Sequence, residues 1–526
     1  MAATQNKLAW LKFRTLLFGH PLTTQSAESH RVGLLGGIPV FGSDVISSQG
    51  YAVDEILYVL SGIGAVGFAA MSEVSVAIIL LLLSILLVYR KAIQRYPHGG
   101  GSYTIAQAYL GEKFGLAAGA SLSLDYILTV AVSVSSAVEN LTGIFPWLAP
   151  VPTKVLADCL IILFMTWVNL RGLKESARLF ALPVYLYLAT ILSLIGFGIF
   201  KVLVYGGTPA ELAQPMATGG HTLTVFLFIR AMAGGTTALT GIEAISNGVT
   251  AFKAPAQKRA IQTLFVLGAV VALGLLGMAF LAGSYHLVPS PKNTILNQLG
   301  LIVFGQTPLY YVLMATAAMI LVIAANTPFA GLPILLSLMA RDGYAPRYFK
   351  NLGDRLVYSA GIWSLSIVSI LLIIIFRGDT HTMLPLYAIG VLISFALTGL
   401  GLAKHVWQAR SKGWLNDFVI FAFGGSVSFV VFVVFLITKF HDGAWVVVIV
   451  LPVLGLFFKT VSEVYKREIA SVKAGPEEIA AFNVEIARID LRRKNIKLSE
   501  YRSKIVIPVF DLNRIVLKAM LYAYEL

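Results

Sequence analysis

Uncharged apolar runs of membrane-spanning length recur along the chain and constrain its fold more than any other feature. Residues 260–291 and 418–438, for example, contain no Asp, Glu, Lys or Arg. A helix needs about 20 such residues to cross roughly 30 Å of hydrocarbon. The chain is 57% apolar and 13% charged, whereas soluble proteins are about 45–50% apolar and about 25% charged. We therefore predict an all-α polytopic membrane protein, and we exclude a disordered chain or a set of soluble domains.

Basic residues indicate how the predicted helices are oriented. The N-terminal segment and one alternating set of predicted loops together contain 21 Lys and Arg residues. The other set of loops contains 5. Because basic loops stay on the cytoplasmic side, we expect both termini to be cytoplasmic, in a bacterial-type plasma membrane. The same asymmetry explains the net charge of +14 without a nucleic-acid partner. The twelve predicted spans are residues 32–60, 66–90, 115–144, 155–171, 179–204, 223–249, 260–284, 309–338, 358–376, 382–402, 416–437 and 443–459.

The segments outside the spans define three predicted regions. Residues 1–31 are cytoplasmic and favour an amphipathic helix on the membrane surface, and residues 32–460 form the transmembrane domain. Residues 461–526 form a cytoplasmic tail in which residues 504–510 read as a buried strand and residues 511–526 as the following helix. One such strand–helix unit cannot bury its own apolar faces. Either the chain is truncated or this piece packs on another subunit.

Two of the predicted spans are interrupted at their centres by glycines, hydroxyl groups and one acid. The first carries Asp44 within residues 41–51, and the sixth carries Glu243 within residues 233–246. This composition suits unwound helices whose backbone faces a cavity. The alternatives are an interfacial loop in the first span and, in the sixth, a kinked helix in which Glu243 pairs with Arg230.

The third predicted span carries a polar stripe. Asp125, Thr129, Ser133 and Ser136 recur on one helical face. Serine and threonine alone would favour a helix-packing seam, but an acid within a span favours a functional site. Interruptions in spans one and six, five spans apart, are typical of transporters built from inverted repeats. We expect residues 32–204 and 223–402 to be the two repeats, with residues 416–459 as two appended helices.

The three acids point to a cation as the ligand of this predicted site. Backbone carbonyls, hydroxyl groups and carboxylates are hard oxygen ligands that suit an alkali ion. A substrate carboxylate would be repelled by Asp44. We expect Asp44, Asp125, Thr240 and Glu243 to bind potassium, and we assign proton coupling mainly to Glu243, with Asp44 and Asp125 as the other candidates.

Other polar features are weaker signals. Residues 97–103 are glycine-rich and are expected to form a cytoplasmic turn. Asp54, Glu55 and Glu139 are expected to be solvated at the interface, with an entry vestibule as the alternative. The single cysteine, Cys159, excludes an intrachain disulfide. The sequence contains no recognisable catalytic triad or metalloprotease pattern, so we expect neither an enzyme nor a cofactor.

Several motifs resemble known transporters. Pro97-x-x-Gly-Gly and Asn169-Leu-Arg-Gly resemble the amino acid–polyamine–organocation superfamily. The strings at residues 43–51, 124–133 and 240–243 resemble its KimA branch of KUP-type potassium importers. The resemblance covers nearly all of residues 31–526 and implies the LeuT-type 5+5 fold and potassium uptake by proton symport. It places the cation-site positions of this branch on Asp44, Tyr51, Asp125, Tyr126, Ser133, Thr240, Glu243 and Tyr387.

The resemblance also carries expectations about assembly. Such importers are homodimers with exchanged cytoplasmic domains that cyclic di-AMP inhibits. Residues 504–526 resemble only the first strand and helix of that domain, so control by cyclic di-AMP is an open question for this chain. The alternatives to a potassium importer are a proton-coupled amino acid or polyamine permease on the same fold and, from another class, a channel or receptor without a coupled cycle.

Overall fold

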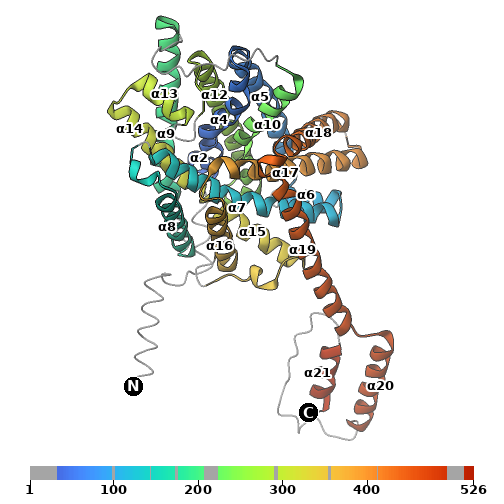
Figure 1. Ribbon diagram of the computed structural model, residues 1–526. Helices are drawn as coiled ribbons and strands as arrows, with labels where there is room; N and C mark the ends of the chain where they lie inside the picture. Colours follow the sequence, from blue (N-terminus) through green and yellow to red (C-terminus); the bar gives the residue numbers. More distant parts are fainter. Residues whose placement is uncertain are drawn as a thin grey trace, which may run out of the picture. The chain divides into compact units, whose positions relative to one another are not determined.

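The computed structural model describes residues 32–96, 101–142, 144–171, 176–206, 223–289, 294–353, 357–411, 413–493 and 514–525 (Figure 1). Within these residues the chain is helical apart from connecting turns, and an isolated β bridge pairs Val32 with Phe252. The chain divides into two compact units, Met1–Leu456 and Phe457–Leu526. The amphipathic helix predicted before residue 32 and the strand predicted at residues 504–510 lie outside the described residues.

Ten helical stretches in the described part of the chain are long and apolar enough to cross a membrane, so the chain is a multi-pass membrane protein. Each coincides with one of the twelve predicted spans. The other two predicted spans do not form a single long helix. The ninth predicted span is α16 (Ser359–Ile375), which has 17 residues, and the first predicted span is divided into shorter helices. The total of twelve stays a prediction. The ten are α5 (Ala65–Arg95), α7 (Glu112–Thr142), α8 (Val151–Leu170), α9 (Ser176–Tyr205), α10–α11 (Val225–Asn247), α12 (Ala256–Ser284), α14–α15 (Pro308–Arg341), α17 (Thr380–Ala409), α18 (Trp414–Thr438) and α19 (Trp445–Val472).

The first predicted span is bent rather than unwound, which corrects the sequence prediction. It consists of α2 (Leu34–Phe41), α3 (Ser43–Ser47) and α4 (Gln49–Leu60). The joints at Gly42 and Ser48 keep right-handed helical dihedral angles. Two serine hydroxyls bond back to their own helix, since Ser47 Oγ donates to the carbonyl of Asp44 at 3.0 Å and Ser48 Oγ donates to the carbonyl of Val45 at 2.8 Å. Such local bonds bend a helix without opening it.

The sixth predicted span is interrupted, as its sequence indicates. It consists of α10 (Val225–Gly235), a 3₁₀ turn η4 (Thr236–Leu239) and α11 (Ile242–Asn247). Between η4 and α11, Thr240 is extended, with φ −65° and ψ 154°, and Gly241 is left-handed, with φ +78°. Glycine adopts this conformation without the steric cost that a Cβ atom would add. Helices α3 and α4 both contact η4, so the two segmented spans face each other.

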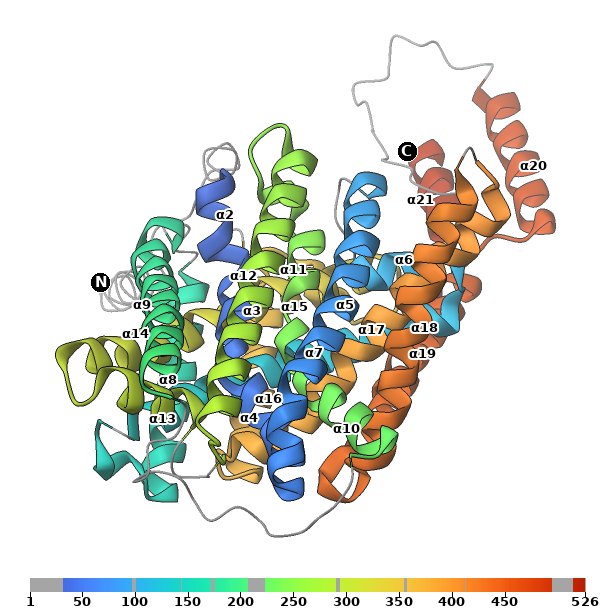
Figure 2. The ribbon, with the colours of Figure 1, turned by 90° about the horizontal axis from the view of Figure 1, so that it is seen from above.

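Helices α7 and α17 pass through the interior of the first unit, packed against one another (Figures 1 and 2). In the most apolar stretch of each of these two helices, 83% of the residues are buried. The corresponding share is 22% in α8 and 28% in α9. The exposed side chains of α9 include Leu182 and Leu203, which are 74% and 77% exposed. This apolar exterior around a polar interior is the arrangement expected in a bilayer, where lipid takes the place of water.

Two short helices connect long ones within the first unit. Helix α6 (Gly101–Tyr109) lies between α5 and α7 in the chain, and α13 (Ile295–Phe304) lies between α12 and α14. The remaining described helices belong to the second unit, where α20 (Pro476–Arg493) contacts α21 (Arg514–Glu525). Arg514 Nε lies 2.8 Å from Glu478 Oε2. The Gly475 amide and the Arg514 guanidinium donate hydrogen bonds that lower the pKa of Glu478.

Candidate functional site

The three acids singled out in the sequence come from three elements that meet in the interior. Asp44 lies on α3, Asp125 on α7 and Glu243 on α11. The side chains of Asp44 and Glu243 are 4% and 7% exposed. Asp125 is partly buried, and its Oδ1 atom is fully buried. The charged groups that act on Asp125 are Asp44 and Glu243, so the fold concentrates negative charge here.

Asp44 lies against the break in the sixth predicted span. A Cβ atom at Gly241 would be 2.7 Å from Asp44 Oδ2, so only a residue without a side chain fits beside this carboxyl group. On the other side, the hydroxyl group of Tyr387 from α17 donates a hydrogen bond to Asp44 Oδ1 at 3.4 Å. The left-handed glycine and the acid therefore bring α3, α11 and α17 together at one point.

Among the described residues, buried oxygens without a hydrogen-bond partner include Asp125 Oδ1, the Tyr51 hydroxyl and the hydroxyl of Ser43, which precedes Asp44 in the chain. Tyr51, on α4, is close to Thr240 and Tyr387, and it faces the carboxyl groups of Asp44 and Asp125. Buried polar atoms are nearly always hydrogen-bonded in folded proteins, so these unsatisfied oxygens make the cluster a candidate ligand site.

Glu243 lies at the N-terminus of α6. The backbone N–H of Ser102 donates to Glu243 Oε1 at 3.0 Å. Asn247 and Tyr89 also lie within interaction range of this carboxyl group, and Asn247 Nδ2 donates to the Tyr126 hydroxyl at 2.9 Å. The glycine-rich segment predicted as a turn thus continues into a buried helix from Gly101 onward, while its residues 97–100 lie outside the described part.

The remaining predicted site residues divide into two groups. The Thr240 hydroxyl is buried at the break and donates to the carbonyl of Thr237 at 2.9 Å. The Thr129 hydroxyl donates to the carbonyl of Asp125 at 2.8 Å, which directs it to its own helix. Ser133 is buried one turn further along α7. The structure therefore gathers Asp44, Tyr51, Asp125, Thr240 and Tyr387 in one cluster, places Tyr126 and Glu243 beside Asn247, and leaves Thr129 and Ser133 along α7.

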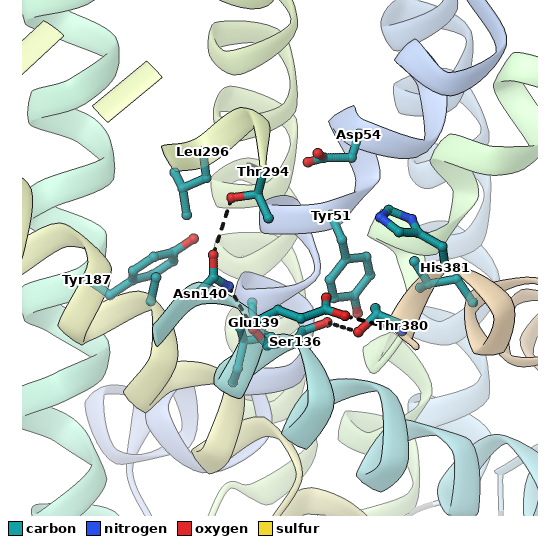
Figure 3. A pocket seen from close by; sticks show the side chains of 14 residues that line it. Tyr51, Asp54, Ser136, Glu139, Asn140, Tyr187, Thr294, Leu296, Thr380 and His381 are labelled. Carbon is teal, nitrogen blue, oxygen red and sulfur yellow. Dashed lines mark hydrogen bonds between the residues drawn. The ribbon is translucent and has the colours of Figure 1, made fainter. Parts of the chain in front are cut away.

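A pocket lies next to this cluster (Figure 3). We call it the side pocket, and Tyr51 belongs to both. The pocket lies between the first half of α4, the C-terminal end of α7 and the start of α17. It is lined by Ser47, Tyr51, Asp54, Ser136, Glu139, Asn140, Tyr187, Thr294, Leu296, Ala317, Leu321, Thr380, His381 and Leu384.

The acids around the side pocket correct a second sequence prediction. Asp54 and Glu55 were expected to be solvated at the interface, but each is 3% exposed. The Ile295 N–H at the start of α13 donates to Asp54 Oδ1 at 3.0 Å. Glu55 lies 3.3 Å from His381 Nδ1 and 3.8 Å from Lys439 Nζ. Sequence spacing alone could not predict this, because the partners come from segments more than 200 residues away.

The site residues that the sequence analysis missed are mainly backbone donors and their neighbours. Ser102 acts through its N–H group, and Asn247 acts on α11 one turn after Glu243. Asn247 could have been found, since it follows Glu243 by four residues and shares its helical face. No pattern of side chains could have marked the N–H of Ser102, because every residue except proline has one.

Comparison with known proteins places this fold in a family. The family model described as "Amino acid permease" matches residues 33–458. The potassium transporter KimA of Bacillus subtilis is 36% identical over 521 residues, which are 98% of this chain and 81% of the relative. This relationship confirms the resemblance found in the motifs.

Two more distant relatives are each 25% identical. The low-affinity putrescine importer PlaP of Escherichia coli aligns over 63% of this chain and 72% of its own length. The probable potassium transport system protein Kup 2 of a Bradyrhizobium species aligns over 74% of this chain and 62% of its own length. The chain therefore belongs to the amino acid permease family of the amino acid–polyamine–organocation superfamily.

Proposed function

We propose that this chain is a secondary active transporter that imports potassium ions by proton symport. The observation that carries the proposal is the cluster of Asp44, Asp125 and Tyr51, with two buried oxygens that lack hydrogen-bond partners. The charged groups acting on Asp125 are themselves acidic. Burying such charges is costly unless a cation or a proton compensates them.

The ligand atoms favour a small monovalent cation. Carboxylates, tyrosine hydroxyls and the Thr240 hydroxyl are hard oxygen donors, as potassium requires. A relative 36% identical over nearly the full chain is a potassium transporter. We expect Asp44, Asp125, Thr240 and Glu243 to bind the ion, with Tyr51, Tyr126, Ser133 and Tyr387 completing or shaping the site.

An amino acid is a poorer substrate for this geometry. The Asp44 carboxyl group belongs to the first predicted span. It already lies against Gly241, at the break in the sixth predicted span. A substrate carboxylate entering there would meet a carboxylate at close range, and like charges repel. A polyamine would not be repelled, and a putrescine importer is among the relatives. Putrescine is therefore the rival substrate to test.

Proton coupling is assigned mainly to Glu243. Its Oε1 accepts the N–H of Ser102, so the side chain is held at the N-terminus of α6. Symport carries the proton and the cation inward together, so Glu243 holds a proton while the cation occupies the neighbouring carboxylates, and both leave on the same side of the membrane. Asp44 and Asp125 mainly bind the cation in this scheme. We propose no catalytic reaction and no resident cofactor.

The membrane context belongs to the same proposal. The distribution of basic loops supports cytoplasmic termini in a bacterial-type plasma membrane. The resemblance supports a homodimer, while inhibition by cyclic di-AMP is proposed only if the rest of the cytoplasmic domain is present. The inverted repeat of residues 32–204 and 223–402 stays part of this proposal.

Flux measurements in proteoliposomes test the function directly. We expect rubidium-86, a potassium analogue, to accumulate against its gradient only when a proton gradient is imposed, and excess potassium to compete with it. Putrescine or amino acid uptake without rubidium uptake would instead select a permease. Rubidium flux that follows its own gradient regardless of pH would indicate a channel.

A further inference from the structure

We propose that the side pocket contains a second cation-binding site centred on Asp54, separate from the cluster around Asp44 and Asp125. This inference rests on the proposed cation transport and specifies where an ion binds before or after it occupies that cluster. None of the motifs that indicated the central cluster includes Asp54.

The first argument is an unpartnered carboxylate oxygen. Asp54 is 3% exposed, and its Oδ1 accepts the Ile295 N–H at 3.0 Å. Its Oδ2 is buried and has no hydrogen-bond partner, although the residue lines the side pocket. Figure 3 shows the carboxyl group turned toward Thr294 across the pocket. A buried carboxylate oxygen without a partner is costly, and a cation in the pocket would satisfy it.

The second argument is the charge balance around the pocket. Two neighbouring acids, Glu139 and Glu55, have basic partners. Glu139 is paired with Lys154, and Glu55 lies near His381 and Lys439. The imidazole of His381 also acts on Asp54 electrostatically, but its Nδ1 atom pairs with Glu55. Asp54 therefore provides the negative charge in this pocket that a mobile cation can compensate.

The third argument is the chemistry of the other pocket atoms. Thr294 Oγ1 lies 3.3 Å from Asn140 Oδ1, and Asn140 Nδ2 donates to the carbonyl of Ser136 at 3.0 Å. These groups form an oxygen-rich wall opposite Asp54 (Figure 3). Hydroxyl, amide and carboxylate oxygens suit an alkali cation, so the pocket matches the ligand class of the central cluster.

The position of Tyr51 connects the two sites. Its side chain lines the side pocket, while it faces the carboxyl groups of Asp44 and Asp125. Tyr51 therefore contributes to both proposed sites. Two such sites let an ion exchange its hydration water for protein oxygens in two steps. A carboxylate contributes to each step.

The alternative role for Asp54 is structural, as the cap of α13. Side-chain oxygens commonly accept the first N–H groups of a helix. Asp54→Asn separates the two roles, because asparagine keeps an oxygen for the Ile295 N–H but removes the charge. Asn140→Lys leaves Asp54 in place and brings an ammonium group into the pocket, where it would compete with a bound ion.

Equilibrium binding of rubidium-86 to the purified full chain tests the proposal. We expect the wild type to bind one more equivalent than either Asp54→Asn or Asn140→Lys, and rubidium uptake by Asp54→Asn to show a KM raised by about tenfold. Asp417→Asn, which removes a charge at the partly exposed pair with Lys91, should bind as the wild type does.

The outcomes distinguish this proposal from the function on which it rests. Equal rubidium stoichiometry in the wild type and in both pocket variants, each eluting as a monodisperse species, would overturn the second site and leave cation transport standing. A wild type that binds no rubidium would overturn both. Loss of all binding in Asp54→Asn together with normal stoichiometry in Asn140→Lys would show that Asp54 acts only as a structural cap.

Discussion

Asp125 and Tyr51 are the residues whose surroundings say most about the ligand. Each presents a buried oxygen without a hydrogen-bond partner, and they come from two different helices. A core built only for stability would have paired these atoms or replaced them with apolar groups, because an unsatisfied buried polar group costs about 1–3 kcal/mol. Their presence together is best explained by an ion that supplies the missing interaction.

Asp125→Asn tests this explanation. Losing a charged partner costs about 1.5–3 kcal/mol, and about 1.4 kcal/mol corresponds to a tenfold change in affinity. We therefore expect rubidium to bind about 10- to 100-fold more weakly, measured by equilibrium binding and by the KM of uptake. Asp417→Asn, the same chemical change at the protein surface, should leave both values unchanged. An Asp125→Asn variant with wild-type affinity would remove Asp125 from the site.

Gly241 is a second residue whose role can be isolated. It has φ +78°, and a Cβ atom there would press on Asp44. Gly413 has φ +81° with open space around it. At either position alanine would be held in the left-handed region, which lowers the free energy of unfolding by about 1–2 kcal/mol. We expect both variants, Gly241→Ala and Gly413→Ala, to lose thermal stability, Gly241→Ala the more because its Cβ also presses on Asp44, but only Gly241→Ala to lose rubidium uptake per folded protein. Equal uptake in both would show that the contact with Asp44 is unimportant.

At the scale of elements, the two segmented spans make matching contacts with the two short connecting helices. Asp54 on α4 accepts the first N–H of α13, and Glu243 on α11 accepts an N–H at the start of α6, both at 3.0 Å. Asp54 belongs to the first predicted repeat and contacts α13 of the second. Glu243 belongs to the second predicted repeat and contacts α6 of the first. Binding at either acid can therefore affect how a connector of the opposite repeat is held.

Glu243→Gln tests the coupling role of the α11–α6 contact. Glutamine keeps a side-chain oxygen for the Ser102 N–H, so the N-terminus of α6 should stay in place, while a proton can no longer be gained or lost there. We expect rubidium exchange between equal concentrations to persist and accumulation driven by a proton gradient to disappear, as measured in proteoliposomes. Gradient-driven accumulation by the variant would assign coupling to another group.

At the scale of the whole molecule, the chain places its apolar side chains against lipid and its acids inside. The large exposed hydrophobic residues of α8 and α9 and the buried helices α7 and α17 follow from this single requirement. The asymmetry of basic loops then sets the direction in which the helices cross the membrane. Orientation is therefore a property of the complete chain, and it can be measured independently of transport.

Cysteine labelling checks that orientation. In a Cys159→Ala background, Trp147→Cys lies in the exposed turn between α7 and α8, and Lys473→Cys lies between α19 and α20. We expect a membrane-impermeant maleimide to label Trp147→Cys in intact cells and Lys473→Cys only after permeabilisation. The opposite pattern would place both termini outside the cytoplasm.

The sequence by itself determined the membrane class, the positions of the long helices and the three acids Asp44, Asp125 and Glu243 of the candidate site. These follow from local composition, because the bilayer sets the length and hydropathy of each span and makes any charge within it conspicuous. It also placed the interruption of the sixth predicted span within residues 233–246, where the structure has Thr240 extended and Gly241 left-handed.

Only the tertiary structure decided what those residues contact. It showed that Gly42 and Ser48 bend a helix without unwinding it, that Ser102 holds Glu243 with a backbone N–H, and that Asp54 is buried beside a pocket. These contacts join segments between 141 and 241 residues apart. Their chemistry depends on distances in space and on the loss of water, and neither is encoded in the composition of any one segment.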